Sequence, residues 1–441
     1  MIDYKLQSSF NNSPAMRSWL WISLLMLFGL LTAGCVASDQ GAQDASGAPI
    51  PAPAISTTSS AAEKASQTPG CECGCDSTVF SEVGTPEPLA GRPLPRLAPT
   101  ASPVMVTAIT VENVRFIEPI ALPSREDGVF RFQDDGNSLA ISNDRRTRVF
   151  DAPKFYERQE FIHDAMVRML AFGPEDSTLA TLEGPEANGQ AIIWDIRDRQ
   201  SLASLNHVWG VMGWLKKSAA LLAVTRTPSG EGALTRLTPR GEMTTVMRVN
   251  AKLLATSEDG RYVLLQNGEL WDVMQGQLMH QAPRLQAGFL VTPGPALLFL
   301  KEDGEWGVWR KGEKAFFLDP DIDMALLDPS GKTLVFVQRA ENDVLLVQKS
   351  LNDDEERILW RGRGGRITAM AFHPQGRLLA VATAEPKDAP QIRWWDLATG
   401  QALGESSAFQ YEVSHMVFSP DGRRLATGGE DGVLIWGVAA Q

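Results

Sequence analysis

Residues 417–437 read VFSPDGRRLATGGEDGVLIWG, and this pattern of turns and short apolar runs indicates the architecture. Ser419-Pro420-Asp421-Gly422 suits a type I turn, because Pro presets the second position and Gly favours the fourth. A glycine-rich segment then separates RLAT from the closing VLIW. Three short strands joined by tight turns form an antiparallel meander. A meander of this size cannot bury enough apolar surface alone, so it requires neighbouring sheets.

The composition of the chain agrees with a large array of such units. Of its 441 residues, 44% are hydrophobic, which is ample for a packed core. The formal net charge of −12 argues against nucleic acid as a partner, because neutralising a phosphate backbone requires a basic surface. The chain has four cysteines and none after residue 75, which excludes a disulfide-stapled scaffold.

The turn and the Leu-Ala strand that follows it recur along the chain. The apolar residues that anchor the copies are Leu139, Leu179, Leu222, Val263, Leu297, Leu334, Leu379 and Leu425. Successive anchors lie 34 to 46 residues apart, without the periodicity of helical repeats. This spacing predicts an all-β fold, a β-propeller of four-stranded antiparallel blades. Eight anchors predict eight blades, and seven are the alternative because two copies are short.

The last copy has only three strands before the end of the sequence. Its outer strand is therefore expected from the N-terminal side of the array, within residues 104–122 (VMVTAITVENVRFIEPIAL). Closing the ring in this way removes exposed sheet edges.

A second landmark, an aromatic residue followed by an acidic one, stands after several anchors. Its clearest members are Trp194, Asp195, Trp271, Asp272, Trp395, Asp396 and Trp436. The weaker equivalents are Phe150-Asp151, Leu237-Thr238, Trp309-Arg310 and Val347-Gln348. With these motifs, residues 104–441 resemble the WD-repeat (WD40) β-propellers. The large side chains at these positions are expected to be core residues between stacked sheets.

The resemblance is incomplete in one respect. The Gly-His dipeptide typical of the family does not occur, so the hydrogen-bonded tetrad that ties its blades together lacks a member. In the last repeat Asp431 and Trp436 match two members of that tetrad, and no residue matches the histidine.

The N-terminal segment resembles an export signal. Residues 19–33 (WLWISLLMLFGLLTA) follow Arg17 and are shorter than a usual membrane span. They end in Ala33-Gly34-Cys35, which resembles the bacterial lipobox, with a departure at Thr32. The resemblance implies a signal peptide over residues 1–34 and acylation of Cys35. It places the protein at the bacterial cell membrane or envelope, lipid-anchored on the extracytoplasmic side. The alternatives are an uncleaved anchor and an ordinary signal peptide cut near Ala37.

Residues 35–103 are rich in Ala, Pro, Ser and Thr and cannot offset their ordering entropy by burial. They are predicted to form a disordered tether. The tether contains Cys71, Cys73 and Cys75, which lack a nearby fourth ligand for a tetrahedral zinc site. Local or intermolecular disulfides are the simpler prediction for these three thiols.

The sequence offers no catalytic or cofactor-binding motif. The five histidines fall at different places in five repeats, unlike a metal cluster at a propeller axis: His163, His207, His280, His373 and His415. Asp319, Asp321 and Asp323 alternate as calcium ligands can, but lack the Gly and the closing Glu of a calcium loop. We therefore predict no catalytic residue, no cofactor and no metal.

The favoured function is a non-catalytic, envelope-anchored scaffold that binds a protein partner. Its variable loops, residues 183–190, 227–232 and 384–390, are the expected contact regions. The alternative is an envelope propeller enzyme, a hydrolase or lyase with a site at the central channel. A propeller of the periplasmic Tol type, also a binding protein, shares the turn motif but not the Trp-Asp dipeptides.

Overall fold

The computed structural model describes residues 105–175, 177–227, 230–291, 295–319, 321–385, 388–407 and 409–440. Cys35, the signal peptide, the tether and its cysteines at 71, 73 and 75 lie outside the described residues. Predictions about them therefore stay predictions. Within the described part, no helix combines the length and the hydropathy needed to cross a membrane.

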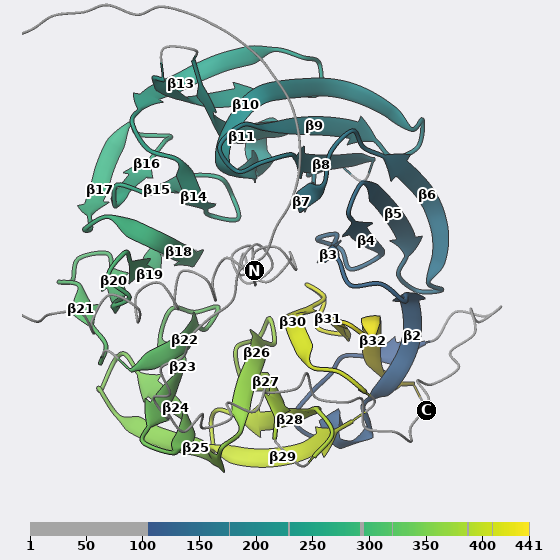
Figure 1. Cartoon of the computed structure of the whole chain (residues 1–441), viewed down its shortest axis with the longest axis vertical. Helices are drawn as coiled ribbons and strands as arrows, with labels where there is room; N and C mark the ends of the chain where they lie inside the picture. Colours follow the sequence, from purple (N-terminus) through teal and green to yellow (C-terminus); the bar gives the residue numbers. More distant parts are fainter. Residues whose placement is uncertain are drawn as a thin grey trace, which may run out of the picture. The chain divides into compact units, whose positions relative to one another are not determined.

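The described residues form a ring of antiparallel sheets, with the first strand of each blade innermost (Figure 1). Five blades are separate sheets, and blades 2 to 4 are joined into one, which gives the eight blades expected from the anchors.

Blades 1 to 4 follow the chain in order. Blade 1 contains β3 (Val129–Phe132), β4 (Ser138–Asn143), β5 (Arg146–Asp151) and β6 (Tyr156–Ile162). Blade 2 contains β7 (Val167–Phe172), β8 (Thr178–Glu183), β9 (Gly189–Asp195) and the first half of β10 (Gln200–Leu215). Blade 3 contains the second half of β10, β11 (Ala220–Arg226), β12 (Gly232–Leu237) and β13 (Met243–Val249), with the 3₁₀ turn η2 (Lys216–Ser218). Blade 4 contains β14 (Leu253–Thr256), β15 (Tyr262–Leu265), β16 (Glu269–Asp272) and β17 (Gln277–Gln281).

Blades 5 to 8 complete the ring. Blade 5 contains β18 (Leu285–Val291), β19 (Ala296–Lys301), β20 (Trp306–Arg310) and β21 (Phe316–Phe317). Blade 6 contains β22 (Ile322–Leu327), β23 (Thr333–Ala340), β24 (Asp343–Ser350) and β25 (Glu356–Arg363). Blade 7 contains β26 (Arg366–Phe372), β27 (Leu378–Ala384), β28 (Gln391–Asp396) and β29 (Gln401–Ser406). Blade 8 contains β30 (Val413–Phe418), β31 (Arg424–Gly429) and β32 (Gly432–Ala439), completed by β1 (Val106–Thr107) and β2 (Glu118–Ser124).

Strand β10 serves two blades, which the sequence did not predict. Its first half pairs with β9 and its second half with β11. His207 (φ 58°) and Gly210 (φ 100°) turn the chain between the halves. Gly210 also pairs in parallel with Leu253, and a Cβ on it would meet the Leu253 carbonyl oxygen at 2.1 Å. This close approach links blades 2 to 4 into one sheet.

The repeat anchors lie where the predicted repeat requires. All eight stand on the second strand of a blade, and each is fully buried. Alternate residues of a strand point to opposite faces of its sheet. In β4, Leu139 and Ile141 pack in a cluster with blade 8, while Ala140 between them packs in a cluster with blade 2.

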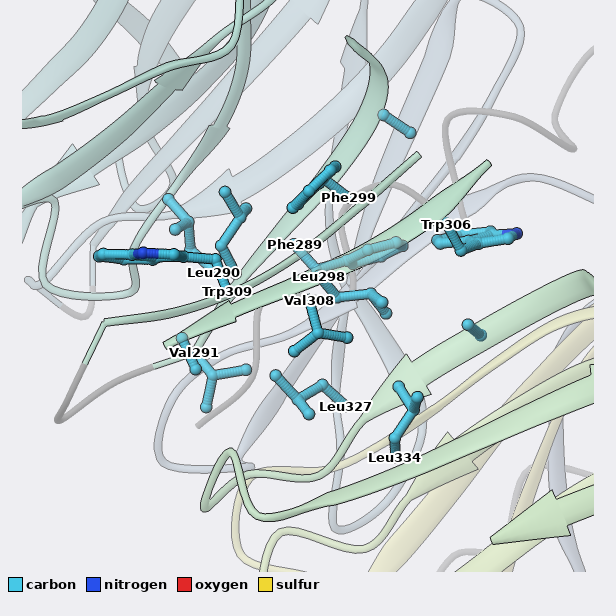
Figure 2. Packing of buried hydrophobic residues seen from close by; sticks show 14 of the residues in the cluster. Phe289, Leu290, Val291, Leu298, Phe299, Trp306, Val308, Trp309, Leu327 and Leu334 are labelled. Atoms are coloured by element: carbon cyan, nitrogen blue, oxygen red, sulfur yellow. The ribbon is translucent and has the colours of Figure 1, made fainter. Parts of the chain in front are cut away.

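Apolar clusters connect every blade to its neighbours. The six clusters of the described residues join blades 1 and 2, 2 to 4, 4 to 6, 6 and 7, 7 and 8, and 8 and 1. Figure 2 shows part of one cluster, in which Trp309 and Val308 of blade 5 share a core with Leu327 and Leu334 of blade 6. Burial of this kind stabilises by roughly 25 cal/mol per Å² of apolar surface, so the core lies between the blades.

The N-terminal side of the array closes the ring, as predicted. Strand β2 pairs antiparallel with β32, with Glu118 opposite Gly437 and Ser124 opposite Val433, and β1 extends the pairing to Ala439. The closure reaches Ser124, two residues beyond the predicted segment. Between the two strands the chain buries Ile109 and Val114 against blades 7 and 8.

In two blades, the residue predicted as the second landmark is not the one that pairs with the anchor. In the other six, the anchor stands directly opposite the landmark residue, as Leu425 does opposite Trp436. In blade 3 the partner of Leu222 is Arg236 rather than Leu237. In blade 6 the partner of Leu334 is Lys349 rather than Val347. We expected an apolar residue opposite the anchor in these two blades. The length of the turn between the second and third strands sets the pairing register instead, and it places a basic residue there.

The glycine of the first turn in a blade also contacts the preceding blade. Gly260 has φ 73°, and a Cβ on it would lie 2.6 Å from the Trp214 carbonyl oxygen. Gly276 has a similar φ of 63° but has nothing within 4 Å. Comparing substitutions at the two glycines therefore distinguishes the cost of backbone strain from the cost of losing the contact between blades.

We expect Gly260→Ala to lower the free energy of unfolding by roughly 2–4 kcal/mol, because strain and a backbone clash add. Gly276→Ala should cost only about 1 kcal/mol, from the left-handed φ alone. Urea denaturation of both full-length variants measures the difference. Equal losses would mean that the contact with Trp214 carries no energy.

Candidate interaction surface

A β-bulge marks the start of the first strand in seven of the eight described blades. The pairing of first and second strands changes register there in blades 2 to 8, as between Val167 and Met169 in β7. A bulge leaves a residue without a ladder partner and re-aims its side chain, which is why bulges often border functional sites.

Five of the residues within these bulges are polar: Arg168, Gln286, Asp323, Thr368 and Ser414. We call them the bulge residues. They stand on the first strands, which are the innermost strands in Figure 1. They lie near the end of the ring where first strands begin and second strands end, which we call the loop face. Their sequence signal is a polar residue after an apolar one, followed by a second apolar residue in VRM, LQA, IDM and ITA and by histidine in VSH. This signal stands one strand before the anchors, and we did not predict it.

The three variable loops border the same face. Each joins the second strand of a blade to the third: β8 to β9, β11 to β12, and β27 to β28. Residues 228–229 and 386–387 of these loops lie outside the described part. The predicted contact regions and the bulge residues therefore belong to one end of the ring.

Arg168 lies beside the loop of blade 2. Its Nε and Nη2 atoms are buried and have no hydrogen-bond partner among the described residues. Burial lowers the pKa of its guanidinium to about 10, and Glu186 acts in the opposite direction. Glu186 forms an ion pair with Lys252, which precedes β14. The Arg168 charge is therefore only partly compensated.

A second arginine stands close to this loop. Val208 pairs with Gly189 of the blade 2 loop on one side and with Thr225 of β11 on the other. The following residue, Trp209, is half-buried, and the Arg226 guanidinium lies over its ring, 4.1 Å from the centroid. We define the basic cluster as Arg168, Trp209, Arg226 and Lys252.

The Trp residues of the Trp-Asp motifs lie on the third strands of their blades. Trp395 and Trp436 are buried, whereas Trp194 and Trp271 are partly exposed. Trp194 and Trp436 donate from Nε1 to Thr181 Oγ1 (2.9 Å) and Thr427 Oγ1 (3.0 Å). In blade 7 the position of these threonines is taken by Val381, and the buried Trp395 Nε1 has no partner among the described residues.

The Asp residues of these motifs cap the following turn. Asp195 accepts from the backbone amides of Arg197 (2.7 Å) and Asp198 (3.0 Å). Asp272 and Asp396 cap their turns in the same way. Asp272 also accepts a hydrogen bond from Arg261, and Asp396 accepts one from Arg377.

These arginine contacts determine how the two acids titrate. The hydrogen bonds from Arg377 lower the pKa of Asp396, and burial opposes this only in part. Burial raises the pKa of Asp272, but Arg261 and the backbone amides of Gln275 and Met274 together outweigh it, so the net shift is also downward. These acids stabilise the turns that follow them.

Blade 2 holds a histidine in the surroundings expected for the tetrad. His163 lies edge-on to Trp194, with 5.4 Å between ring centroids, and its Nδ1 is 3.9 Å from Glu183 Oε2. Its Nε2 forms a 2.8 Å hydrogen bond with Thr147 Oγ1 of blade 1. The sequence did not reveal this because an Ile, not a Gly, precedes His163.

In the last blade an aromatic ring lies where the histidine is missing. Phe409 packs on Trp436 with centroids 5.2 Å apart. Asp431 accepts from the backbone amides of Gln410 and Tyr411, each at 2.9 Å. Apolar packing and main-chain donors thus substitute for the side-chain network in this blade.

Three of the remaining histidines also lie between blades, and the four do not share a common centre. His280 stacks on Trp309, His373 bonds the Gly422 carbonyl, and His415 bonds the Gly128 carbonyl. His207 is exposed and bonds Asn188. The described residues contain no group of three His, Cys, Asp or Glu side chains placed to hold a metal ion. In the acidic triplet, Asp323 accepts from Arg339 at 2.6 Å.

An ion-pair bridge crosses the opposite face. Lys216 Nζ lies 2.6 Å from Asp134 Oδ2 and 2.7 Å from Glu258 Oε1. Burial lowers the pKa of this amine, but the two carboxylates outweigh it and the net shift is upward. Asp134, Lys216 and Glu258 belong to the first turns of blades 1, 3 and 4, so the bridge connects blade 3 to its neighbour, blade 4, and also to blade 1, which is not its neighbour.

Comparisons with known proteins agree with this architecture. The family model "WD domain, G-beta repeat" matches residues 403–436. Pre-mRNA-processing factor 19 homolog 2 of Arabidopsis thaliana is 35% identical over 69 residues, which are 16% of this chain and 12% of that protein. The C-terminal WD40 domain of Sif2 is similar in structure (TM-score 0.53, 14% identity, 74% of this chain and 99% of that one). So is the Dos1 propeller (TM-score 0.52, 13% identity, 74% and 96%). These likenesses show the propeller fold.

Proposed function

We propose that this protein is a non-catalytic interaction scaffold, held at the bacterial cell envelope, that binds a protein partner on its loop face. The observation that carries the proposal is the recurrence of polar bulge residues at equivalent places on a rigid ring. WD40 propellers are commonly protein-interaction scaffolds, and residues 403–436 match that repeat.

The chemistry of the bulge residues favours binding over catalysis. They comprise an arginine, a glutamine, an aspartate, a threonine and a serine, spread over five blades. Such a set offers varied hydrogen-bonding contacts around a surface. A catalytic site would instead need a nucleophile, a base and an orienting group within mutual reach.

Photo-cross-linking tests the proposed binding face. A photoreactive amino acid at Gln286 or Thr368 of the full-length protein, expressed in intact cells, should form adducts with one partner protein. The control positions are Arg240 and Met274, which are exposed in turns between third and fourth strands on the opposite face. Adducts of equal yield from both faces would contradict the proposal. So would robust turnover in a hydrolase or lyase screen that Asp323→Asn abolishes.

The envelope anchor is supported by the sequence alone. Ala33-Gly34-Cys35 follows an apolar run of signal-peptide length, and residues 35–103 have the composition of a tether. We expect Cys35→Ala to prevent lipid attachment, because the thiol is the acylated atom. Detergent-phase partitioning should fall several-fold, since the lipid chains supply the membrane affinity. Cys71→Ala is the matched control. Unchanged partitioning of the Cys35 variant would refute the anchor.

A further inference from the structure

We infer that the basic cluster on the loop face binds an acidic peptide segment of the partner through carboxylate contacts to Arg168 and Arg226. This inference rests on the proposed function and adds the chemistry of the partner and the blades that recognise it.

The first step concerns Arg168. A guanidinium that loses water without gaining acceptors is costly, and its Nε and Nη2 are both buried without a partner among the described residues. Glu186, whose charge acts on Arg168, is already paired with Lys252. These two atoms are covered, and Nη2 lies against Gly189 of the blade 2 loop, so a carboxylate from outside reaches them only when that loop shifts. It would then supply the acceptors that Arg168 lacks.

The second step concerns Arg226 and Trp209. Arg226 is exposed, and no ion pair with a described carboxylate holds it. Stacking on the Trp209 ring at 4.1 Å leaves the edge of the guanidinium plane available to a ligand while limiting its motion. Because Val208 pairs with both Gly189 and Thr225, the two arginines belong to adjoining segments of blades 2 and 3.

The third step selects carboxylates over phosphates. The cluster already accommodates one carboxylate, since Glu186 pairs with Lys252. A dianionic phosphate beside Glu186 would meet stronger repulsion than a single carboxylate. The chain carries a net charge of −12, so most of its surface repels an acidic segment. An acidic segment is therefore directed to arginines that lack carboxylate partners, which gives specificity as well as affinity.

Fluorescence anisotropy with the full-length protein tests the inference. The probe is a labelled Glu-Ala repeat peptide, with a Gln-Ala repeat peptide as the uncharged control and phosphatidylglycerol vesicles as the lipid alternative. The variants are Arg168→Gln and Arg226→Gln. Arg240→Gln is the matched control, because it removes the same charge from the opposite face of blade 3.

We expect the Glu-Ala peptide to bind and the Gln-Ala peptide not to bind. Each variant should weaken binding about ten-fold, the value of one charged hydrogen bond, and Arg240→Gln should leave it unchanged. If Arg168→Gln lowers the melting temperature, Arg168→Lys keeps the charge and tests the loss of two-point geometry, while the exposed Arg226 gives an independent result.

Three outcomes would overturn the inference. They are equal binding of the two peptides, equal weakening by Arg240→Gln, and binding of the vesicles but not of the Glu-Ala peptide. If cross-links from Gln286 and Thr368 persist while the acidic peptide does not bind, only this inference fails. If both are absent, the proposed function fails with it.

Discussion

Deletion of residues 105–124 is expected to abolish the cooperative unfolding transition of the propeller. The deletion removes β1, β2 and the buried Ile109 and Val114, and it exposes the edge of β32. The segment also buries Val106, Ile117 and Ile120. Each buried Val or Ile stabilises by roughly 1.5–3 kcal/mol, so the sum of the five approaches the 5–15 kcal/mol that holds a typical domain. Calorimetry of the variant should show no transition at the wild-type temperature, and the free edge should promote aggregation.

Two further variants serve as controls for the deletion of residues 105–124. Deleting residues 40–95 removes more chain but no described residue, and it should leave the transition unchanged. Ile109→Ala keeps both closure strands and should cost about 2–5 kcal/mol, because it only creates a cavity. If the 105–124 deletion unfolds at the wild-type temperature, the closure does not stabilise the ring.

Acidification should destabilise the ring through His163. Burial lowers the pKa of His163 to about 4, whereas an unfolded histidine titrates near 6.5. Between these values the unfolded chain binds a proton that the folded chain does not, so stability falls as the pH falls. The stability that the neutral His163 contributes is fully present above about pH 6.5 and is lost as the pH falls toward 4. From about pH 7.5 to about pH 4.5 the loss amounts to about 2.5 kcal/mol.

His163→Gln separates this histidine from the other titrating groups. The glutamine retains a hydrogen-bonding group for Thr147 but cannot titrate. Denaturation at both pH values should show a pH-dependent loss smaller by about 2.5 kcal/mol than in the wild type. His207→Gln is the control, because His207 is exposed. If the His163 variant keeps the pH dependence of the wild type, the loss of stability on acidification comes from other groups. Examples are His280 and His373, whose pKa values burial also lowers.

The features that repeat in the sequence were predictable, because a repeated blade requires the same residue type at the same depth. The eight anchors are buried for this reason, and the ring closure followed from a missing fourth strand. The two displaced landmarks show the limit of the reasoning. Arg236 and Lys349 lie opposite their anchors because turn length sets the register, and hydrophobicity alone points to the wrong neighbour.

The candidate surface was only partly predictable. The variable loops were visible because they fall outside the apolar and turn positions that recur in every repeat. The bulge residues were not, because one polar residue in an apolar strand reads as noise until pairing shows that five occupy one position. The basic cluster combines residues from blades 2, 3 and 4 that only the doubled strand β10 and the Gly210 contact bring together.

The ion-pair bridge centred on Lys216 affects which blades unfold together. Blades that touch only their neighbours behave as a one-dimensional array, in which opening can spread from one blade to the next. Lys216 binds Asp134 and Glu258, so it couples blade 1 to blades 3 and 4 past blade 2. Together with the shared sheet of blades 2 to 4, this coupling should make blades 1 to 4 open together. Amide hydrogens in blades 1 to 4 should therefore exchange with one common opening free energy, which native-state hydrogen exchange measures.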